Sequence, residues 1–156
     1  MASRAQPALW RETVKAGAVR SGMLGLSVLI FALTLFVTVA LASYRASDPA
    51  INTAAGEVTQ NLAGPAGAWL ADLLLMLLGP AVALLLPAGP IVALRLWRDQ
   101  PAGRWVRMLR GATLGVALMA TALAFVSDAA VMALPAGWGG MVGLGLTDLA
   151  SPDVAR

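Results

Sequence analysis

The chain has 156 residues, of which 59% are apolar and only 12% are charged, and its mean hydropathy is +0.78. A water-soluble domain carries roughly twice that share of charge, so this composition excludes an ordinary soluble fold and indicates a membrane protein. The sequence contains neither His nor Cys, which excludes disulfides and argues against a zinc or haem site.

Residues 1–20 are predicted to form a basic N-terminal tail. Trp10 and the nearby cations suit either an amphipathic segment on the membrane surface or a solvated tail. Residues 21–43 contain no charged side chain and predict the first transmembrane helix, because roughly 20 residues at about 1.5 Å each cross a hydrocarbon core of about 30 Å. The apolar run is longer than the core of a cleaved signal peptide, so we expect a retained helix.

Residues 44–66 are predicted to be a loop, and residues 67–95 a second transmembrane helix. Pro80, Pro87 and Pro90 interrupt this second run. Each proline lacks a backbone donor, so we expect kinks or breaks near Gly79-Pro80 and in the stretch 87–90.

A loop at 96–110 precedes a third apolar run at 111–134, which predicts a third crossing and contains only one charged residue, Asp128. The glycine-rich segment 135–156 is expected to begin a fourth helix near Gly139 without completing it. Three crossings would leave the C-terminus on the opposite side from the N-terminus, and we expect the chain to be a piece of a longer protein. The predicted fold class is an all-α membrane protein with three transmembrane helices plus the start of a fourth in a small helical bundle.

Orientation is predicted from the cations, because Lys and Arg in short loops stay on the cytoplasmic side. They concentrate in the tail and in the second loop, at Arg4, Arg11, Lys15, Arg20, Arg95, Arg98, Arg104, Arg107 and Arg110. The loop 44–66 holds only Arg45, set against Asp48 and Glu57. The N-terminus and residues 96–110 are therefore expected in the cytoplasm, and residues 44–66 and 135–156 in the periplasm.

Charged residues inside apolar runs are the first candidates for a function, because charge within a bilayer is costly. Asp72 and Asp128 are such residues, and Arg45 ends the first run. One interpretation is a proton or ion site. The other is an interfacial polar cluster in which Arg45 pairs with one carboxylate, or in which Asp72 meets the positive end of a helix dipole.

Pairs of small residues three apart allow helices to approach closely. Gly111 with Gly115, and Gly139 with Gly143, form such pairs and suit either an oligomer contact or packing within the chain. The sequence contains no recognisable catalytic motif. A phosphate-binding loop needs Lys after Gly, whereas the single Lys here, Lys15, follows Val14. No catalytic, cofactor-binding or metal-binding residues are expected.

Several short motifs occur in a specific order. Ser43-Tyr44 is followed by Asp48-Pro49, then by the segment NLAGPAGAWLAD at 61–72, an apolar helix with Gly79, a basic loop, and finally GGMVG at 139–143. This series resembles the N-terminal membrane domain of the FtsK/SpoIIIE family of bacterial DNA translocases. The resemblance covers essentially the whole chain, and its most specific parts are residues 43–79 and 135–145.

The resemblance implies a non-enzymatic, four-helix anchor in the bacterial inner membrane at the division septum, in contact with the lipid bilayer and with divisome membrane proteins. A linker and a hexameric ATPase motor that pumps DNA would follow outside these residues, so any hexamer and any DNA contact would come through that motor. In such an anchor, Tyr44, Asp48 and Pro49 would form the turn that ends the first helix. Gly64, Pro65 and Gly67 would shape the start of the second, and Asp72 would pair with Arg45 or contact another division protein. The alternative is a small multi-pass transporter or channel component that uses Asp72 and Asp128.

Overall fold

The computed structural model describes residues 6–50, 58–100, 105–126 and 136–150. Within these ranges the protein is all-α, and three segments are long and apolar enough to span a membrane: Trp10–Ala42, Gly64–Leu85 and Arg107–Phe125. The helices in chain order are α1 (Gln6–Ala42), α2 (Gly64–Leu78), the 3₁₀ helix η1 (Gly79–Leu85), α3 (Ala88–Trp97), α4 (Trp105–Val126) and α5 (Gly140–Ala150).

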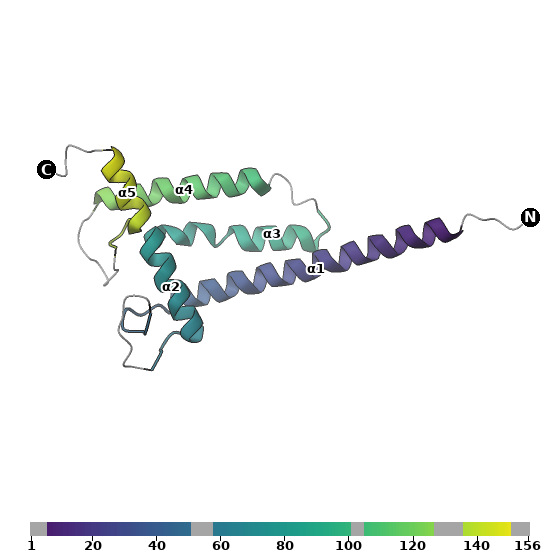
Figure 1. Cartoon of the computed structure of the whole chain (residues 1–156), viewed down its shortest axis with the longest axis horizontal. Helices are drawn as coiled ribbons and strands as arrows, with labels where there is room; N and C mark the ends of the chain where they lie inside the picture. Colours follow the sequence, from purple (N-terminus) through teal and green to yellow (C-terminus); the bar gives the residue numbers. More distant parts are fainter. Residues whose placement is uncertain (1–5, 51–57, 101–104, 127–135, 151–156) are drawn as a thin grey trace, which may run out of the picture.

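The helices α1, α3 and α4 run along the long axis of the molecule (Figure 1). In Figure 1, α3 runs back along α1, which it contacts, while α2 crosses at a steep angle where α1 ends. The helix α4 is drawn roughly parallel to α3 in this view and contacts η1. The helix α5 packs against α4 and also contacts α2. The molecule therefore has two ends. We call the end where α1 stops and α2 begins the loop end, and the end that carries Arg20, Arg95, Arg98, Arg107 and Arg110 the basic end.

The first helix begins earlier than the apolar run that predicts it. It starts at Gln6 and continues for 37 residues to Ala42, so most of the expected tail belongs to the same helix as the apolar run. Trp10, Arg11 and Lys15 are exposed along this extension.

The second apolar run is divided into separate helices. At the end of α2 the backbone of Gly79 has a φ of 60°, a left-handed conformation that favours glycine. The 3₁₀ helix η1 follows with Pro80 in its first turn, and α3 begins after Pro87. Because the prolines remove helix donors, α2 and α3 run in different directions (Figure 1). The breaks lie where the sequence predicted kinks or breaks within a single crossing at 67–95.

Small side chains form the contacts between helices. The buried apolar residues are mostly alanines, namely Ala40, Ala68, Ala71, Ala81, Ala93, Ala120 and Ala124, together with Leu75, Val82, Leu96 and Val116. A methyl group added to Gly139 or Gly143 would clash with Ala120 or Ala124 of α4. One of the two small-residue pairs therefore packs within the chain, as is usual where helices associate in lipid.

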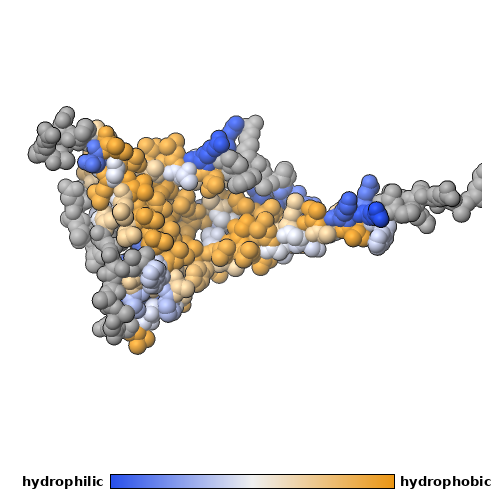
Figure 2. Space-filling model, in the orientation of Figure 1, coloured by the Kyte–Doolittle hydropathy of each residue, from blue (hydrophilic) through white to orange (hydrophobic). Residues whose placement is uncertain are grey.

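Large apolar side chains cover the outside. Leu33, Leu114, Leu118 and Phe125 are each more than half exposed, and Figure 2 shows a predominantly hydrophobic surface with hydrophilic residues gathered towards the basic end and the loop end. A soluble protein buries such side chains, whereas a membrane protein presents them to lipid.

Candidate functional site

The clearest side-chain cluster lies at the loop end and centres on Tyr44 and Asp72. The hydroxyl of Tyr44, just after α1, donates a hydrogen bond to Asp72 Oδ1 of α2 at 3.2 Å. Asp72 is almost completely buried, with 3% of its surface exposed. The ring of Tyr44 packs against the apolar cluster of Leu75 and Val82. A single side chain thus joins the end of α1 to the third turn of α2.

Asn61 makes a second connection between the same elements. Its side-chain amide donates to the carbonyl of Ala40 at 2.9 Å, and its side-chain oxygen accepts from the backbone N–H of Ala63, also at 2.9 Å. The first bond satisfies a carbonyl in the last turn of α1, where no helical donor is available. The second bond is an Asx turn, which directs the chain into α2.

Two further hydrogen bonds hold the segment between the helices. Asp48 Oδ1 accepts from the backbone N–H of Gln60 at 2.8 Å, and Ser43 Oγ accepts from the backbone N–H of Leu62 at 3.1 Å. The backbone N–H of Asp48 also donates to the carbonyl of Arg45, which closes a tight turn after α1. Pro49 follows in this turn and is half-buried.

Glycine is required at two positions where α2 starts. Gly64 has a φ of 71°, which side chains with a Cβ rarely tolerate. At Gly67 a methyl group would clash with the side chain of Ala63, would lie 2.9 Å from Asn61 Oδ1 and would touch Ala40. The absence of a side chain at Gly67 allows α2 to approach both α1 and the Asn61 turn.

Both carboxylates of the cluster are buried. Asp48 and Asp72 are both 3% exposed, and the second carboxylate oxygen of each is buried without a hydrogen-bond partner. Burial, assisted by the neighbouring charges of Asp72 and Asp48 and by the hydrogen bond to Asp72, raises the pKa of Tyr44 to about 12. Tyr44 therefore remains a hydrogen-bond donor at any physiological pH.

Two interpretations of Asp72 from the sequence are wrong. Arg45 is exposed and forms no ion pair with Asp72, whose partner is Tyr44. Asp72 also does not cap its helix, because α2 begins at Gly64 and its first turn contains no acidic residue. The favourable effect of a helix dipole falls off within that first turn.

The remaining predicted residues lie apart from the cluster. Gly111 and Gly115 are exposed on α4, and a methyl group at either would meet no atom within 4 Å. Asp128 lies outside the described residues. Sequence reasoning overlooked Asn61 as a structural centre, although an Asn shortly before Gly-Pro is a recognisable turn signal.

The chemistry available to the cluster is limited. Its polar groups are a phenol, a carboxamide, a hydroxyl and carboxylates, and in the described ranges no three His, Cys, Asp or Glu side chains lie together as a metal site. Hydrogen bonds among these groups position the chain between α1 and α2. The arrangement is that of a structural junction between α1 and α2.

Comparison with known families identifies the chain. A family model of the 4TM region of DNA translocase FtsK/SpoIIIE matches residues 22–153. The chain belongs to this family. The match includes α1 from Gly22 onward, the whole loop-end junction and all later helices. It concerns the membrane region of FtsK/SpoIIIE proteins, which is distinct from their ATPase motor. Neither the comparison with curated proteins nor that with solved structures gives a match.

The family agrees with the helical architecture and leaves one difference to explain. A 4TM region has four transmembrane helices by name, whereas three segments of the described structure reach spanning length and α5 has 11 residues. Eleven helical residues cover about 16 Å, roughly half of the hydrocarbon core. The described helix α5 lies within the segment 135–156, where the sequence predicted the start of a fourth helix.

Proposed function

We propose that this FtsK/SpoIIIE 4TM region is a non-catalytic anchor, which holds a cell-division DNA translocase in the bacterial inner membrane at the septum and thereby serves chromosome segregation. The family match over 22–153 is the observation that carries the proposal. The exposed apolar surface supports the anchoring role (Figure 2). ATP hydrolysis, DNA contact and hexamer formation belong, in this proposal, to a motor outside these residues.

Septal recruitment is tested with a fluorescent protein fused to the N-terminus of the chain. In dividing bacteria that carry the parent translocase, the fusion should gather at midcell. A uniform distribution around the cell envelope would contradict the septal part of the proposal but would leave membrane insertion intact.

The loop end is the proposed contact for divisome membrane proteins. Val58 and Leu62 are 87% and 81% exposed, and Trp69, in the α2 helix that follows, is 54% exposed. Leu62 directly follows Asn61 and donates its backbone N–H to Ser43, so the junction fixes the position of this apolar side chain. A positioned apolar group outside the helices suits a protein contact.

Leu62→Ser should weaken midcell recruitment, because it removes an apolar contact without touching a buried group. Leu149→Ser is the matched control, since Leu149 is 80% exposed but lies on α5. Equal recruitment of the two variants would argue against a partner at the loop end.

The proposed orientation places the basic end in the cytoplasm, following the positive-inside rule. Ser47 at the loop end and Gln100 at the basic end are both exposed, and the chain is naturally free of cysteine. In intact cells without an outer-membrane barrier, an impermeant thiol reagent should label Ser47→Cys and spare Gln100→Cys. The reverse pattern would invert the topology.

A small transporter or channel component is the second candidate, and the buried, unpaired oxygen of Asp72 is the observation that favours it. Proton or ion flux in liposomes that disappears in Asp72→Asn would support this function. The apolar clusters between α2, η1 and α4 offer no continuation of a polar pathway from Asp72 in the described part of the bundle. We therefore place the anchor first.

A further inference from the structure

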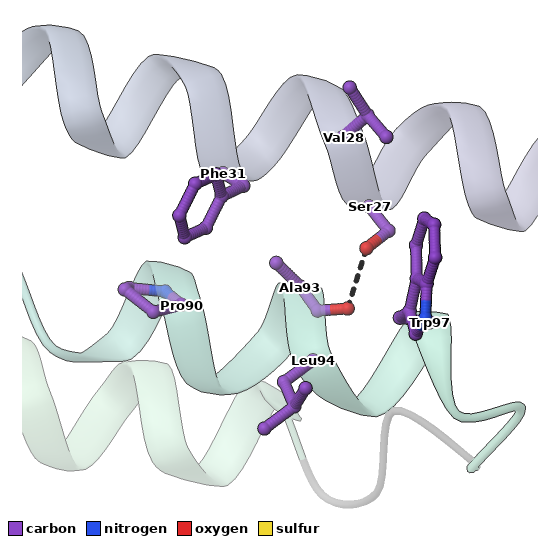
Figure 3. A pocket seen from close by; sticks show the side chains of 7 residues that line it. All are labelled: Ser27, Val28, Phe31, Pro90, Ala93, Leu94 and Trp97. Carbon is purple, nitrogen blue, oxygen red and sulfur yellow. Dashed lines mark hydrogen bonds between the residues drawn. The ribbon is translucent and has the colours of Figure 1, made fainter.

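A lateral groove lies between α1 and α3 on the side of the basic end. It has a volume of about 400 Å³ and is lined by Ser27, Val28, Phe31, Pro90, Ala93, Leu94 and Trp97. The α3 residues recur at helical spacing along a stripe, so the groove follows the helix axis. Figure 3 shows Phe31 next to Pro90 at one end of the groove and Trp97 next to Ser27 towards the other.

The groove is suited to a hydrocarbon chain. Its polar side-chain groups are the hydroxyl of Ser27 and the indole N–H of Trp97. Ser27 donates its hydroxyl proton to the carbonyl of Ala93 at 2.6 Å (Figure 3), so that proton is not available to an occupant. Val28, Phe31, Leu94 and Trp97 are each about half exposed. The groove therefore opens sideways from the bundle, towards the region that lipid tails fill in a bilayer.

The end of the groove near Trp97 leads to a cluster of basic side chains. Arg20 donates to the carbonyl of Trp97 at 2.9 Å and pairs with Asp99 at 2.9 Å. Lys15 and Arg20 line an adjoining depression together with Asp99. Arg95 and Arg98 follow on the last turn of α3 and its cap.

This cluster carries an excess of positive charge. The Arg20–Asp99 pair is the one ion pair within the described ranges, so Lys15, Arg95 and Arg98 have no carboxylate partner there. Trp97 stands between these cations and the apolar groove, a position that tryptophan favours at the level of lipid headgroups. Hydrocarbon-lined space and unpaired cations thus adjoin one another along α3.

We propose that this site binds one anionic phospholipid, with an acyl chain in the α1–α3 groove and its phosphate beside Trp97 and Arg98. A zwitterionic lipid would fill the groove equally well but would leave the cationic cluster without a net counter-charge. Anionic lipid is therefore selected by charge complementarity at the rim. The inference concerns the leaflet at the basic end and does not depend on recruitment to the septum.

Trp97 itself provides the measurement. The full chain is reconstituted in phosphatidylcholine vesicles that contain a minor fraction of phosphatidylglycerol with brominated acyl chains, which quench nearby tryptophan. Trp97→Phe, measured in parallel, isolates the contribution of Trp97 from that of the other four tryptophans. Quenching by the brominated phosphatidylglycerol should exceed quenching by the same fraction of brominated phosphatidylcholine. The apparent affinity for phosphatidylglycerol should be higher by about fivefold for each basic side chain that binds the lipid. Equal quenching by the two lipids would overturn the proposal.

Two matched pairs of variants locate the site. Val28→Phe should reduce the preference by filling the groove, whereas Leu29→Phe, at a neighbouring residue that is equally exposed but outside the groove, should not. Arg98→Gln should weaken the preference about fivefold. Arg11→Gln removes the same charge about 14 Å along α1 from Arg20 and should leave the preference unchanged. If Val28→Phe has no effect, the groove is not the site. If both arginine variants weaken binding equally, the attraction is a diffuse effect of net charge and the proposal fails.

Discussion

The two ends of the bundle join their helices with similar polar groups in different environments. At the loop end, Asn61 and Asp72 are nearly inaccessible and connect α1 to α2 through hydrogen bonds of 2.9 Å and 3.2 Å. At the basic end, Arg20 and Asp99 connect α1 to the turn that follows α3, with side chains that are 38% and 66% exposed. A buried hydrogen bond lies in a low dielectric and leaves an unsatisfied group when it is broken, whereas an exposed pair exchanges its partner for water. The loop end should therefore determine stability, and the basic end should remain free for ligands.

The largest expected difference comes from one added methyl group. Gly67→Ala should lower the stability by about 2 kcal/mol or more, because the methyl clashes with Ala63 and crowds Asn61 and Ala40. Gly25→Ala is the control, since a methyl at Gly25 in α1 meets no atom within 4 Å and alanine favours helix by up to about 1 kcal/mol. The thermal unfolding midpoint in detergent should fall for the first variant and stay level or rise for the second. A fall in both would refute the special role of the loop end.

Removal of the Asn61 side chain should have the next largest effect. Asn61→Ala leaves the carbonyl of Ala40 and the N–H of Ala63 without their partners, at a cost of about 1 to 2 kcal/mol. Gln60→Ala removes a similar amide from the preceding position, where the side chain is exposed and only the backbone contributes to the junction. Comparable destabilisation of the two variants would mean that the junction does not depend on the Asn61 amide.

The third test uses the fact that Tyr44 is the only tyrosine in the chain. Its ultraviolet absorbance should titrate at a pKa of about 12 in the folded protein, against 10.0 after unfolding. Because the folded state holds this proton more tightly, the stability that Tyr44 contributes is fully present below pH 10 and is lost as the pH rises through 12. Asp72→Asn should lower the pKa of Tyr44 but should not return it to 10.0, because burial is the largest cause of the shift.

The control for this titration is Asp148→Asn, at an exposed residue of α5. It removes the same charge at a residue away from Tyr44, and it should leave the pKa of Tyr44 unchanged. If the pKa of Tyr44 were unchanged in Asp72→Asn, the Tyr44 hydroxyl and the Asp72 carboxylate would not interact in solution.

Sequence reasoning succeeded where local rules suffice. The composition predicted an all-α membrane protein, and the ordered motifs from Tyr44 to Gly143 indicated the family that the comparison then showed. Prolines and Gly79 marked the place where α2 ends. These signals need no knowledge of distant residues, because helix length and proline chemistry act within a few positions.

Features that depend on distant contacts could not be predicted in the same way. The turn after α2 brings the backbone of Gly79 against Trp138 and Gly140, some sixty positions later, and the direction of α2 depends on that approach. Arg45 and Tyr44 are adjacent in sequence, and only the packing of the ring against Leu75 and Val82 makes Tyr44 the partner of Asp72. Charge alone favoured the wrong residue.

The smallest effect is expected at the basic end. A double-mutant cycle of Arg20→Gln and Asp99→Asn should give a coupling of about 0.5 kcal/mol or less, because both side chains are exposed and the pair is screened by salt. The coupling should disappear at high ionic strength, while the cost of Asn61→Ala should persist there because its bonds are buried and uncharged. A coupling energy as large as the stability lost in Asn61→Ala would contradict the claim that the loop end contributes more to stability than the basic end. A weak pair, by contrast, leaves Arg20 able to turn from Asp99 towards a lipid phosphate at little cost, and anionic lipid should then reduce the coupling further.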